Sequence, residues 1–260
     1  MNIVQYTKAV TLEEAWELNQ VRGAVVLGGC CWLRLSPQRR IAQAIDLSGL
    51  GLDTIEEGDD AFIIGAMVTL GAFGRHEGLV TYTQGAVKEA TRHIVGTQFR
   101  NLATIGGSVS GRFGFSDIWT LLLALDADVE LYKGGRISLF DFGKKGPGKD
   151  IVSHIIVPKK RGNTAYASLR LNETDFPIIA VAVHADGKDV RCAIGSRPGR
   201  AEVMSIPVDA VRTLGYEKAG QELAEKVKYE TNLRGSAEYR HDMAVVLCRR
   251  LLAQTMGDDV

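Results

Sequence analysis

The sequence has no net charge and little proline. Its 260 residues include 31 basic and 31 acidic side chains, which balance to a formal charge of zero. A neutral chain gives no whole-molecule electrostatic attraction to nucleic acid or to an anionic membrane surface, so we expect neither as a partner. The 6 prolines against 29 glycines favour short elements joined by tight turns over long, stiff linkers.

Cysteine is also scarce, and its placement excludes the usual metal sites. Of the four cysteines, Cys30 and Cys31 are adjacent, whereas Cys192 and Cys248 stand alone. Structural zinc sites and iron–sulfur clusters need thiolates grouped at short spacing, so we expect no metal site in this chain. The five histidines are scattered and form no Ser-His-Asp pattern, so we expect no catalytic side chain.

Long apolar runs and the common dinucleotide fingerprint are both missing. No run approaches the ~20 apolar residues that a membrane-spanning helix needs. The start "MNIVQYTKAV" lacks the basic and then apolar pattern of a secretory signal, so we expect a cytoplasmic protein without a membrane span. No GxGxxG follows an expected strand, which argues against a Rossmann site.

The remaining patterns predict an α+β protein. Thr11 and Glu14 form a capping box that opens a helix over 12–20, and Thr69 is placed to cap a short helix. Further helices are expected over 83–95, after Asp117, over 217–227 and over 237–254, the last with Arg249 and Arg250 on its solvent side. Strands are expected at 24–27, 44–47, 61–66, 152–157, 165–169, 178–185 and 190–195, with a hairpin at 129–132 and 136–139.

A change in composition divides the chain. Residues 143–164 are basic, polar and glycine-bearing on both sides of a single strand. We therefore expect a domain boundary near residue 160, with one domain over 1–160 and a second over 161–260. The strands of the second domain are expected to pair antiparallel.

Two glycine-rich turns carry the chemical signal. "LGGCC" follows the strand at 24–27, and "TIGGS" (104–108) lies ahead of the helix after Asp117. Paired glycines let backbone N–H donors come close to a phosphate without obstruction by a Cβ, and nearby hydroxyls add donors. Two such turns exceed the need of a mononucleotide and fit a dinucleotide that spans two small lobes.

Asp117 has two interpretations at this stage. Its position at a helix start suits an N-cap that accepts from first-turn amides. Its carboxylate also suits hydrogen bonds from the hydroxyls of a sugar or a sugar-like chain.

The combination of motifs resembles the FAD-binding subunit of the xanthine dehydrogenase family of molybdenum hydroxylases, including the carbon monoxide dehydrogenase flavoprotein. The family's AGGTDL-like turn corresponds to "LGGCCW" (27–32), and its "IGAMTTL" corresponds to "IGAMVTL" (64–70). Its second turn corresponds to "QFRNLATIGGS" (98–108), followed by Asp117 and "LLALDADVEL" (122–131). The ending 233–252 is similar to the family's closing helix, so the resemblance covers nearly the whole chain in order.

The resemblance implies a fold and a set of cofactor contacts. The fold is a two-lobed FAD module of the vanillyl-alcohol-oxidase (PCMH) type, with lobes at about 1–54 and 55–160, followed by a C-terminal α+β domain. The family pattern places the diphosphate on the two turns, Asp117 on the ribityl or ribose hydroxyls, and Ile94 near the flavin or the adenine. Ser168 and Asp175 would close the site from the second domain. The implied FAD-binding set is Leu27, Gly28, Gly29, Cys30, Cys31, Trp32, Ile94, Thr104, Gly107, Ser108, Asp117, Ser168 and Asp175.

The resemblance also implies partners and a place in electron transfer. A molybdenum-cofactor subunit would oxidise the substrate, a [2Fe-2S] subunit would relay the electrons, and FAD on this chain would reduce an acceptor such as NAD⁺. Two alternatives are a free-standing flavin-dependent oxidoreductase and a flavin-free structural subunit of such a complex. Three departures from the family bear on them: Cys30-Cys31 replaces the usual Thr-Asp, Ser168 replaces a common lysine, and 112–116 is more aromatic. Phe113 or Phe115 would either stack on the flavin or fill the core.

Overall fold

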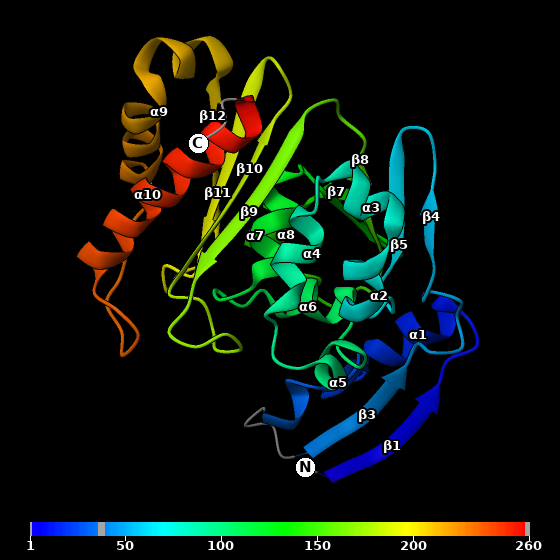
Figure 1. Ribbon diagram of the computed structural model, residues 1–260. Helices are drawn as coiled ribbons and strands as arrows, with labels where there is room; N and C mark the ends of the chain where they lie inside the picture. Colours follow the sequence, from blue (N-terminus) through cyan, green and yellow to red (C-terminus); the bar gives the residue numbers. More distant parts are fainter. Residues whose placement is uncertain (1, 36–39, 258–260) are drawn as a thin grey trace. The chain divides into compact units, whose positions relative to one another are not determined.

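The computed structural model describes residues 2–35 and 40–257 and divides into two compact units (Figure 1). Each unit is assembled from stretches that are separated in the sequence. Unit 1 comprises Met1–Phe73, Thr97–Gly111 and Ala127–Val157, and unit 2 comprises Gly74–Gly96, Arg112–Asp126 and Pro158–Val260. The domain boundary near residue 160 stays a prediction, because each compact unit combines three separate stretches of the chain and so does not test a single boundary.

A small parallel sheet forms the first part of unit 1. Its strands are β1 (Asn2–Lys8), β3 (Arg40–Asp46) and β2 (Ala24–Leu27), in that order across the sheet. Helix α1 (Leu12–Asn19) connects β1 to β2 and begins at Thr11, whose hydroxyl accepts from the Glu14 amide at 3.1 Å. The Thr11 half of the predicted capping box is therefore confirmed. The Glu14 carboxylate accepts from the Val10 amide at 2.8 Å instead of from the amide of Thr11.

A five-stranded sheet forms the rest of unit 1. Its order is β4 (Ile55–Glu57), β5 (Ala61–Gly65), β8 (Val152–Pro158), β6 (Asp128–Leu131) and β7 (Gly135–Ser138). The predicted hairpin is confirmed, because β6 and β7 pair antiparallel. Helix α2 (Leu70–Arg75) begins after Thr69, whose hydroxyl accepts from the Ala72 amide at 3.1 Å. The shorter segments are η1 (Leu33–Leu35), α5 (Thr97–Arg100), α6 (Ile105–Gly111) and α8 (Leu139–Lys145).

Unit 2 is built on an antiparallel four-stranded sheet, as predicted. Strands β9 (Asn163–Leu169), β10 (Ile179–Ala185), β11 (Asp189–Gly195) and β12 (Glu202–Pro207) pair in sequence order. Helices α9 (Val208–Glu225) and α10 (Ala237–Met256) pack together on one side of the sheet, and α7 (Asp117–Ala124) packs against β10 and β11 (Figure 1). Two short helices, α3 (Glu77–Tyr82) and α4 (Ala86–Arg92), complete the unit.

The core of unit 2 lies between the sheet and the two long helices. Every residue of β10 is buried, and Ile179, Val181 and Val183 belong to the cluster that α9 and α10 cover. Leu251 and Leu252 of α10 join this core, while Arg249 and Arg250 are exposed as predicted. Burial of this continuous apolar surface is the main source of stability for the unit.

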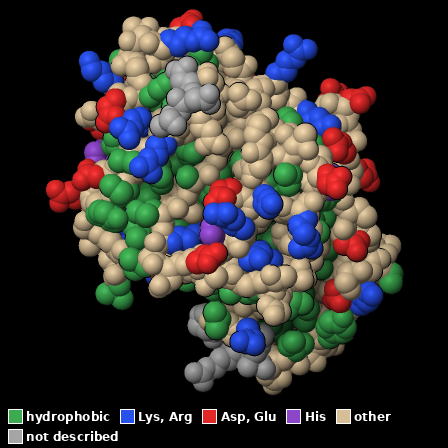
Figure 2. Space-filling view, viewed as in Figure 1, with side chains coloured by type: hydrophobic (Ala, Val, Ile, Leu, Met, Phe, Trp, Pro, Cys, Tyr) green, Lys and Arg blue, Asp and Glu red, His purple; other side chains and the backbone are tan. Residues whose placement is uncertain are grey.

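The surface carries both signs of charge. Acidic and basic side chains are mixed over the face shown in Figure 2, in keeping with the zero formal charge. Across residues 2–35 and 40–257, no helix has both the length and the apolar character that a membrane span requires.

Candidate functional site

The first glycine turn (residues 27–32) extends from the end of β2 in unit 1. Gly29 and Cys30 both have left-handed backbone, with φ of 67° and 60°. Within the described part of the chain, the amides of residues 28–31 donate no hydrogen bond to protein. Consecutive free amides in such a turn form an anion-binding concavity, because no carbonyl competes for them.

The side chains of this turn add little to anion binding. Burial raises the pKa of both the Cys30 and the Cys31 thiol, so both stay protonated near neutral pH. The Cys31 thiol lies 3.5 Å from the Gly29 carbonyl oxygen, to which it donates. Trp32 packs edge-on against Phe99, with 5.9 Å between ring centroids. The turn therefore presents backbone donors and neutral side chains.

The second glycine turn (residues 104–108) differs from the loop that the sequence predicted. Its glycines lie in the first turn of α6, a short helix that sequence patterns did not indicate. Thr104 precedes this helix, and its hydroxyl oxygen accepts from the Gly107 amide at 3.1 Å. The amides of Ile105, Gly106 and Ser108 donate to protein carbonyl oxygens at 2.8, 2.9 and 3.0 Å. This turn thus offers the hydroxyl hydrogen of Thr104 and no spare backbone amide at residues 105–108.

The two turns meet in unit 1. A Cβ added to Gly28 would lie 2.9 Å from the Thr104 hydroxyl oxygen and 3.4 Å from the Gly107 Cα atom. A Cβ added to Gly107 would lie 2.9 Å from the Gly28 carbonyl oxygen, and one added to Gly29 would overlap the Leu102 carbonyl. The glycines are therefore needed because the turns touch each other, in addition to any approach of a phosphate.

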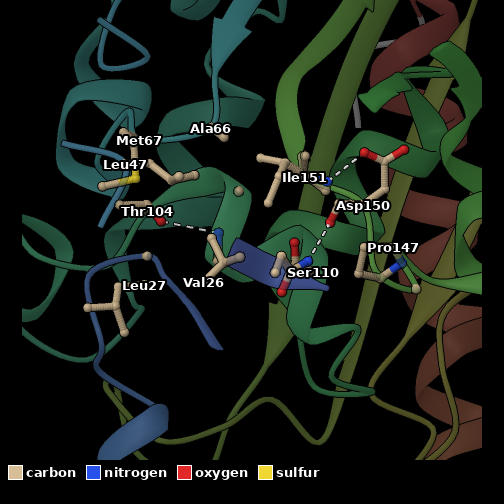
Figure 3. A pocket seen from close by; sticks show the side chains of 16 residues that line it. Val26, Leu27, Leu47, Ala66, Met67, Thr104, Ser110, Pro147, Asp150 and Ile151 are labelled. Atoms are coloured by element: carbon tan, nitrogen blue, oxygen red, sulfur yellow. Dashed lines mark hydrogen bonds between the residues drawn. The ribbon is translucent and has the colours of Figure 1, made fainter. Parts of the chain in front are cut away.

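A cavity of about 200 Å³ opens beside this contact (Figure 3). Its walls are mostly apolar, with Val26, Leu27 and Met67 among the side chains that Figure 3 labels. The polar lining includes Thr104 and Ser110, and the Ser110 hydroxyl has no protein partner among the described residues. The volume is below the ~300–1,000 Å³ of whole-ligand pockets, so the cavity suits one section of an elongated ligand.

The only acidic side chain in this lining, Asp150, accepts hydrogen bonds from three backbone amides. The Asp150 carboxylate accepts from the backbone of Lys133, Gly134 and Ile151, at 2.7–3.3 Å. A carboxylate that accepts several amides repels an anion less than a free one does. Of the first turn, Leu27 and Gly28 line the cavity, whereas Gly29, Cys30, Cys31 and Trp32 lie outside its lining. The lining offers an anion the Gly28 amide together with the Thr104 and Ser110 hydroxyls.

Ser110 is a residue that sequence reasoning missed. It follows Gly106 by four positions and Gly107 by three within α6, so it shares their helical face. Ser108, which was predicted, instead donates its hydroxyl to the Thr104 carbonyl at 3.0 Å and is absent from the cavity lining. The helical spacing would have distinguished these serines, had the glycines been recognised as the start of a helix.

The remaining predicted residues belong to unit 2, and three of them share one arginine. The Arg170 guanidinium donates to Asp117 at 2.5 Å, to the Ser168 hydroxyl at 3.2 Å and to the Asp175 carbonyl at 2.6 Å. Arg170 was not among the predicted site residues, because arginine at one position carries no signal of its partners. Ile94 follows α4 and is half-buried. A cofactor role for Ile94, Asp117, Ser168 and Asp175 stays a prediction.

Asp117 is not the N-cap of its helix, so one of its two interpretations is wrong. The cap of α7 is Ser116, whose hydroxyl accepts from the Trp119 amide at 3.1 Å. Asp117 is buried and accepts from the Tyr166 hydroxyl as well as from Arg170. Burial raises the pKa of Asp117, and the charge of Arg170 opposes that rise. The carboxylate therefore holds α7 to strand β9 and the segment that follows it.

The aromatic residues of 112–116 form a stack. Phe113 and Phe115 are parallel, with centroids 5.1 Å apart, and Phe115 lies 4.2 Å from the ring of Phe176. All three are half-buried. They are thus neither fully in the core nor isolated on the surface.

Among the described residues, no group of three His, Cys, Asp or Glu side chains is arranged to hold a metal ion.

Comparisons with known proteins identify relatives of this chain. Residues 2–160 match the family described as the FAD binding domain in molybdopterin dehydrogenase. The chain is 28% identical to the nicotine 6-hydroxylase medium subunit of Paenarthrobacter nicotinovorans, over 96% of each chain. Its fold is similar to a chain of quinoline 2-oxidoreductase from Pseudomonas putida 86, with a TM-score of 0.84, 17% identity and coverage of 99% and 98%. A chain of carbon monoxide dehydrogenase from Hydrogenophaga pseudoflava gives a TM-score of 0.83, 22% identity and 98% coverage of both.

Proposed function

Because the chain belongs to the family of FAD-binding domains of molybdopterin dehydrogenases, we propose that it passes electrons through FAD from an iron–sulfur subunit to an external acceptor such as NAD⁺. FAD is the cofactor of this family, and its isoalloxazine ring accepts and releases electrons singly or in pairs. The protein's contribution is to bind FAD, orient it and set its electrostatic surroundings. A catalytic side chain is not required for that role.

The observation that carries the proposal is the contact between the two glycine turns beside a lined cavity. The free amides of residues 28–31 would hold the diphosphate, with hydroxyl hydrogens from Thr104 and Ser110 as further donors. The apolar side chains of Val26, Leu27 and Met67 would exclude water from one side of it. Replacing Thr-Asp by Cys30-Cys31 leaves this arrangement intact, since the donors are backbone groups.

The partners follow from what the chain lacks. Within the described residues Cys30 and Cys31 are in the first turn, and Cys192 and Cys248 are fully buried, so this chain would take its electrons from a cluster on another subunit. A [2Fe-2S] subunit and a molybdenum-cofactor subunit would supply the two missing centres. Support comes from the nicotine 6-hydroxylase relative, which is named as a medium subunit and matches along 96% of its length. The cytoplasm remains the expected location.

A second proposal concerns the domains. We keep the boundary near residue 160, with the FAD-binding domain before it and the flavoprotein C-terminal domain after it. Support comes from the family match, which ends at residue 160.

The Gly107→Ala variant tests the assignment of the turns. The added Cβ would lie 2.9 Å from the Gly28 carbonyl oxygen, so the turns must separate, at a cost of about 1–3 kcal/mol for overpacking. We expect FAD affinity to fall about tenfold or more, measured by flavin absorbance per protein and by titration of the apoprotein with FAD. Circular dichroism checks that the fold is retained.

Gly58→Ala is the matched control. Its Cβ would make an ordinary contact, 3.4 Å from the Ala61 carbonyl oxygen, so flavin content should equal that of the wild type. Equal FAD affinity in Gly107→Ala and Gly58→Ala would contradict the assignment. A wild-type protein that stays colourless after incubation with FAD would instead favour the flavin-free structural subunit.

A further inference from the structure

Unit 2 contains a second, smaller cavity that the proposed function does not use. Its volume is about 110 Å³, and its lining includes Phe115, Phe176, Ser196, Asn232, Arg234 and Arg240. Apart from Phe115, which the sequence offered as a possible stacking partner of the flavin, none of these residues was predicted to contact FAD. The cavity combines two arginines with an aromatic wall.

Arg240 is buried with an uncompensated charge. Its side chain in α10 is among the largest fully buried ones, and the residue is 1% exposed. Its guanidinium donates to neutral oxygens only: the carbonyls of Ile178 and of Ser196, the latter at 2.6 Å, and the Asn232 amide oxygen at 2.5 Å. No carboxylate among the described residues pairs with it, and its Nε has no partner. A buried charge without a counter-ion is costly, and an anion would offset that cost.

Ser196 places an unused hydroxyl at the same cavity. The residue is 3% exposed, and its Oγ has no hydrogen-bond partner in the described structure. Its φ of 61° is left-handed, a strained backbone for a serine. The strain is held by its amide, which donates to the Gly114 carbonyl at 2.9 Å, and by its own carbonyl, which accepts from Arg240. Buried polar atoms normally find partners, so the two unused groups point to an absent ligand.

Arg234 and the phenylalanines complete the cavity. The Arg234 guanidinium carbon lies 5.0 Å from the centre of the Phe176 ring, and Phe115 packs on the same ring at 4.2 Å. Arg234 also pairs with Asp175 at 3.1 Å, yet its Nε is buried without a partner. Its side chain is 36% exposed, which gives the cavity a route to solvent.

We propose that this cavity binds a small oxyanion, either a phosphate group or a carboxylate. The Nε groups of Arg240 and Arg234 and the Ser196 hydroxyl would donate to it, as charge-assisted hydrogen bonds require. The volume equals that of three or four water molecules at ~30 Å³ each, which admits an inorganic oxyanion or the anionic end of a larger molecule and excludes a whole nucleotide. The site does not depend on the FAD assignment, since none of its donors is used there.

The test is calorimetric titration of the FAD-loaded protein with inorganic phosphate and, separately, with acetate. Potassium chloride at matched ionic strength serves as the reference. We expect saturable binding with one ion per chain, and the tighter ligand identifies the site as one for a tetrahedral or for a planar oxyanion. Ser196→Gly, which removes the hydroxyl and suits the left-handed backbone, should weaken binding about tenfold. Arg234→Gln should weaken it at least as much.

Arg250→Gln is the control, because Arg250 is exposed on the same helix as Arg240. It should leave oxyanion affinity unchanged, and flavin content should be unchanged in Ser196→Gly. Absence of saturable binding of either anion in the wild type would overturn the proposal. So would undiminished binding in both Ser196→Gly and Arg234→Gln when circular dichroism shows them folded.

Discussion

Asp117 shows how far a single residue can be understood from sequence. Its place beside a helix start left two interpretations, a helix cap and a ligand contact, and neither identified a distant partner in the protein. Its actual partners, Tyr166 and Arg170, lie 49 and 53 positions away, so no local pattern could have identified them. The cap was one residue earlier, at Ser116. Serine and aspartate are nearly equal as N-caps, so propensity could not separate them.

The buried pair of Asp117 and Arg170 should be expensive to break. The side chains of Arg170 and Asp117 are only 7% and 5% exposed. Asp117→Ala would therefore leave the Arg170 guanidinium buried without its carboxylate partner. We expect the free energy of unfolding to fall by about 3–5 kcal/mol, measured by urea denaturation. Glu217→Ala, which breaks an exposed pair with Arg249, should change it little. A similar decrease in the free energy of unfolding in both variants would show that the buried Asp117 pair stabilises the fold no more than an exposed pair does.

Flavin content in Asp117→Ala separates its two roles. If Asp117 also binds the sugar hydroxyls of FAD, affinity should fall by about 1–3 kcal/mol, the scale for losing a hydrogen bond to a charged group. The FAD affinity is measured by titrating the variant with FAD under conditions in which the variant is folded. Undiminished affinity would remove Asp117 from the cofactor site and leave only the structural role.

At the scale of elements, sequence patterns predicted the strands in which burial of one or both faces gives a regular spacing of apolar residues. The strands β2, β5, β8 and β10 were predicted because their apolar residues are consecutive or alternate. Strand β1 was missed because six of its seven residues are exposed, so no period distinguishes an inner face. Helix α6 was missed because paired glycines are poor helix formers, and close packing of Gly106 against Ala66 overrides that preference.

The start of helix α9 was predicted too late in the chain. The sequence predicted a helix over 217–227, whereas the structure continues it back to Val208 across Gly215. Gly215 has a non-helical φ of 77°, so two helical segments meet at a kink. The glycine was a reason to begin the predicted helix after it, and tertiary packing of Val208 and Val211 accounts for the earlier start.

The Ser116 cap gives a prediction about helix α7. Ser116→Ala removes the acceptor for the Trp119 amide, so the free energy of unfolding should fall by about 1 kcal/mol. Ser205→Ala is a suitable control, because Ser205 is exposed on β12. Chemical denaturation of both variants measures the difference. An unchanged midpoint in Ser116→Ala would mean that water replaces the cap without loss.

For the whole molecule, the cofactor was predictable and the reason for the glycines was not. The order of motifs identified the family, since it preserves "IGAM", "RNLATIGGS" and "LLALDA" along the chain. The sequence could not reveal that Gly28 and Gly107 lie against each other, because their contact joins positions 79 apart. Nor could it reveal that 74–96 and 112–126 pack with the C-terminal stretch as unit 2. Both facts depend on long-range packing.

The most direct measurement is an experimental structure of the FAD-loaded complex, because it locates the diphosphate itself. We predict phosphate oxygens at hydrogen-bond distance, about 2.7–3.2 Å, from the amides of residues 28–31, with the Thr104 or Ser110 hydroxyl on the same diphosphate. Phosphates placed away from both glycine turns, or on one turn alone, would contradict the account.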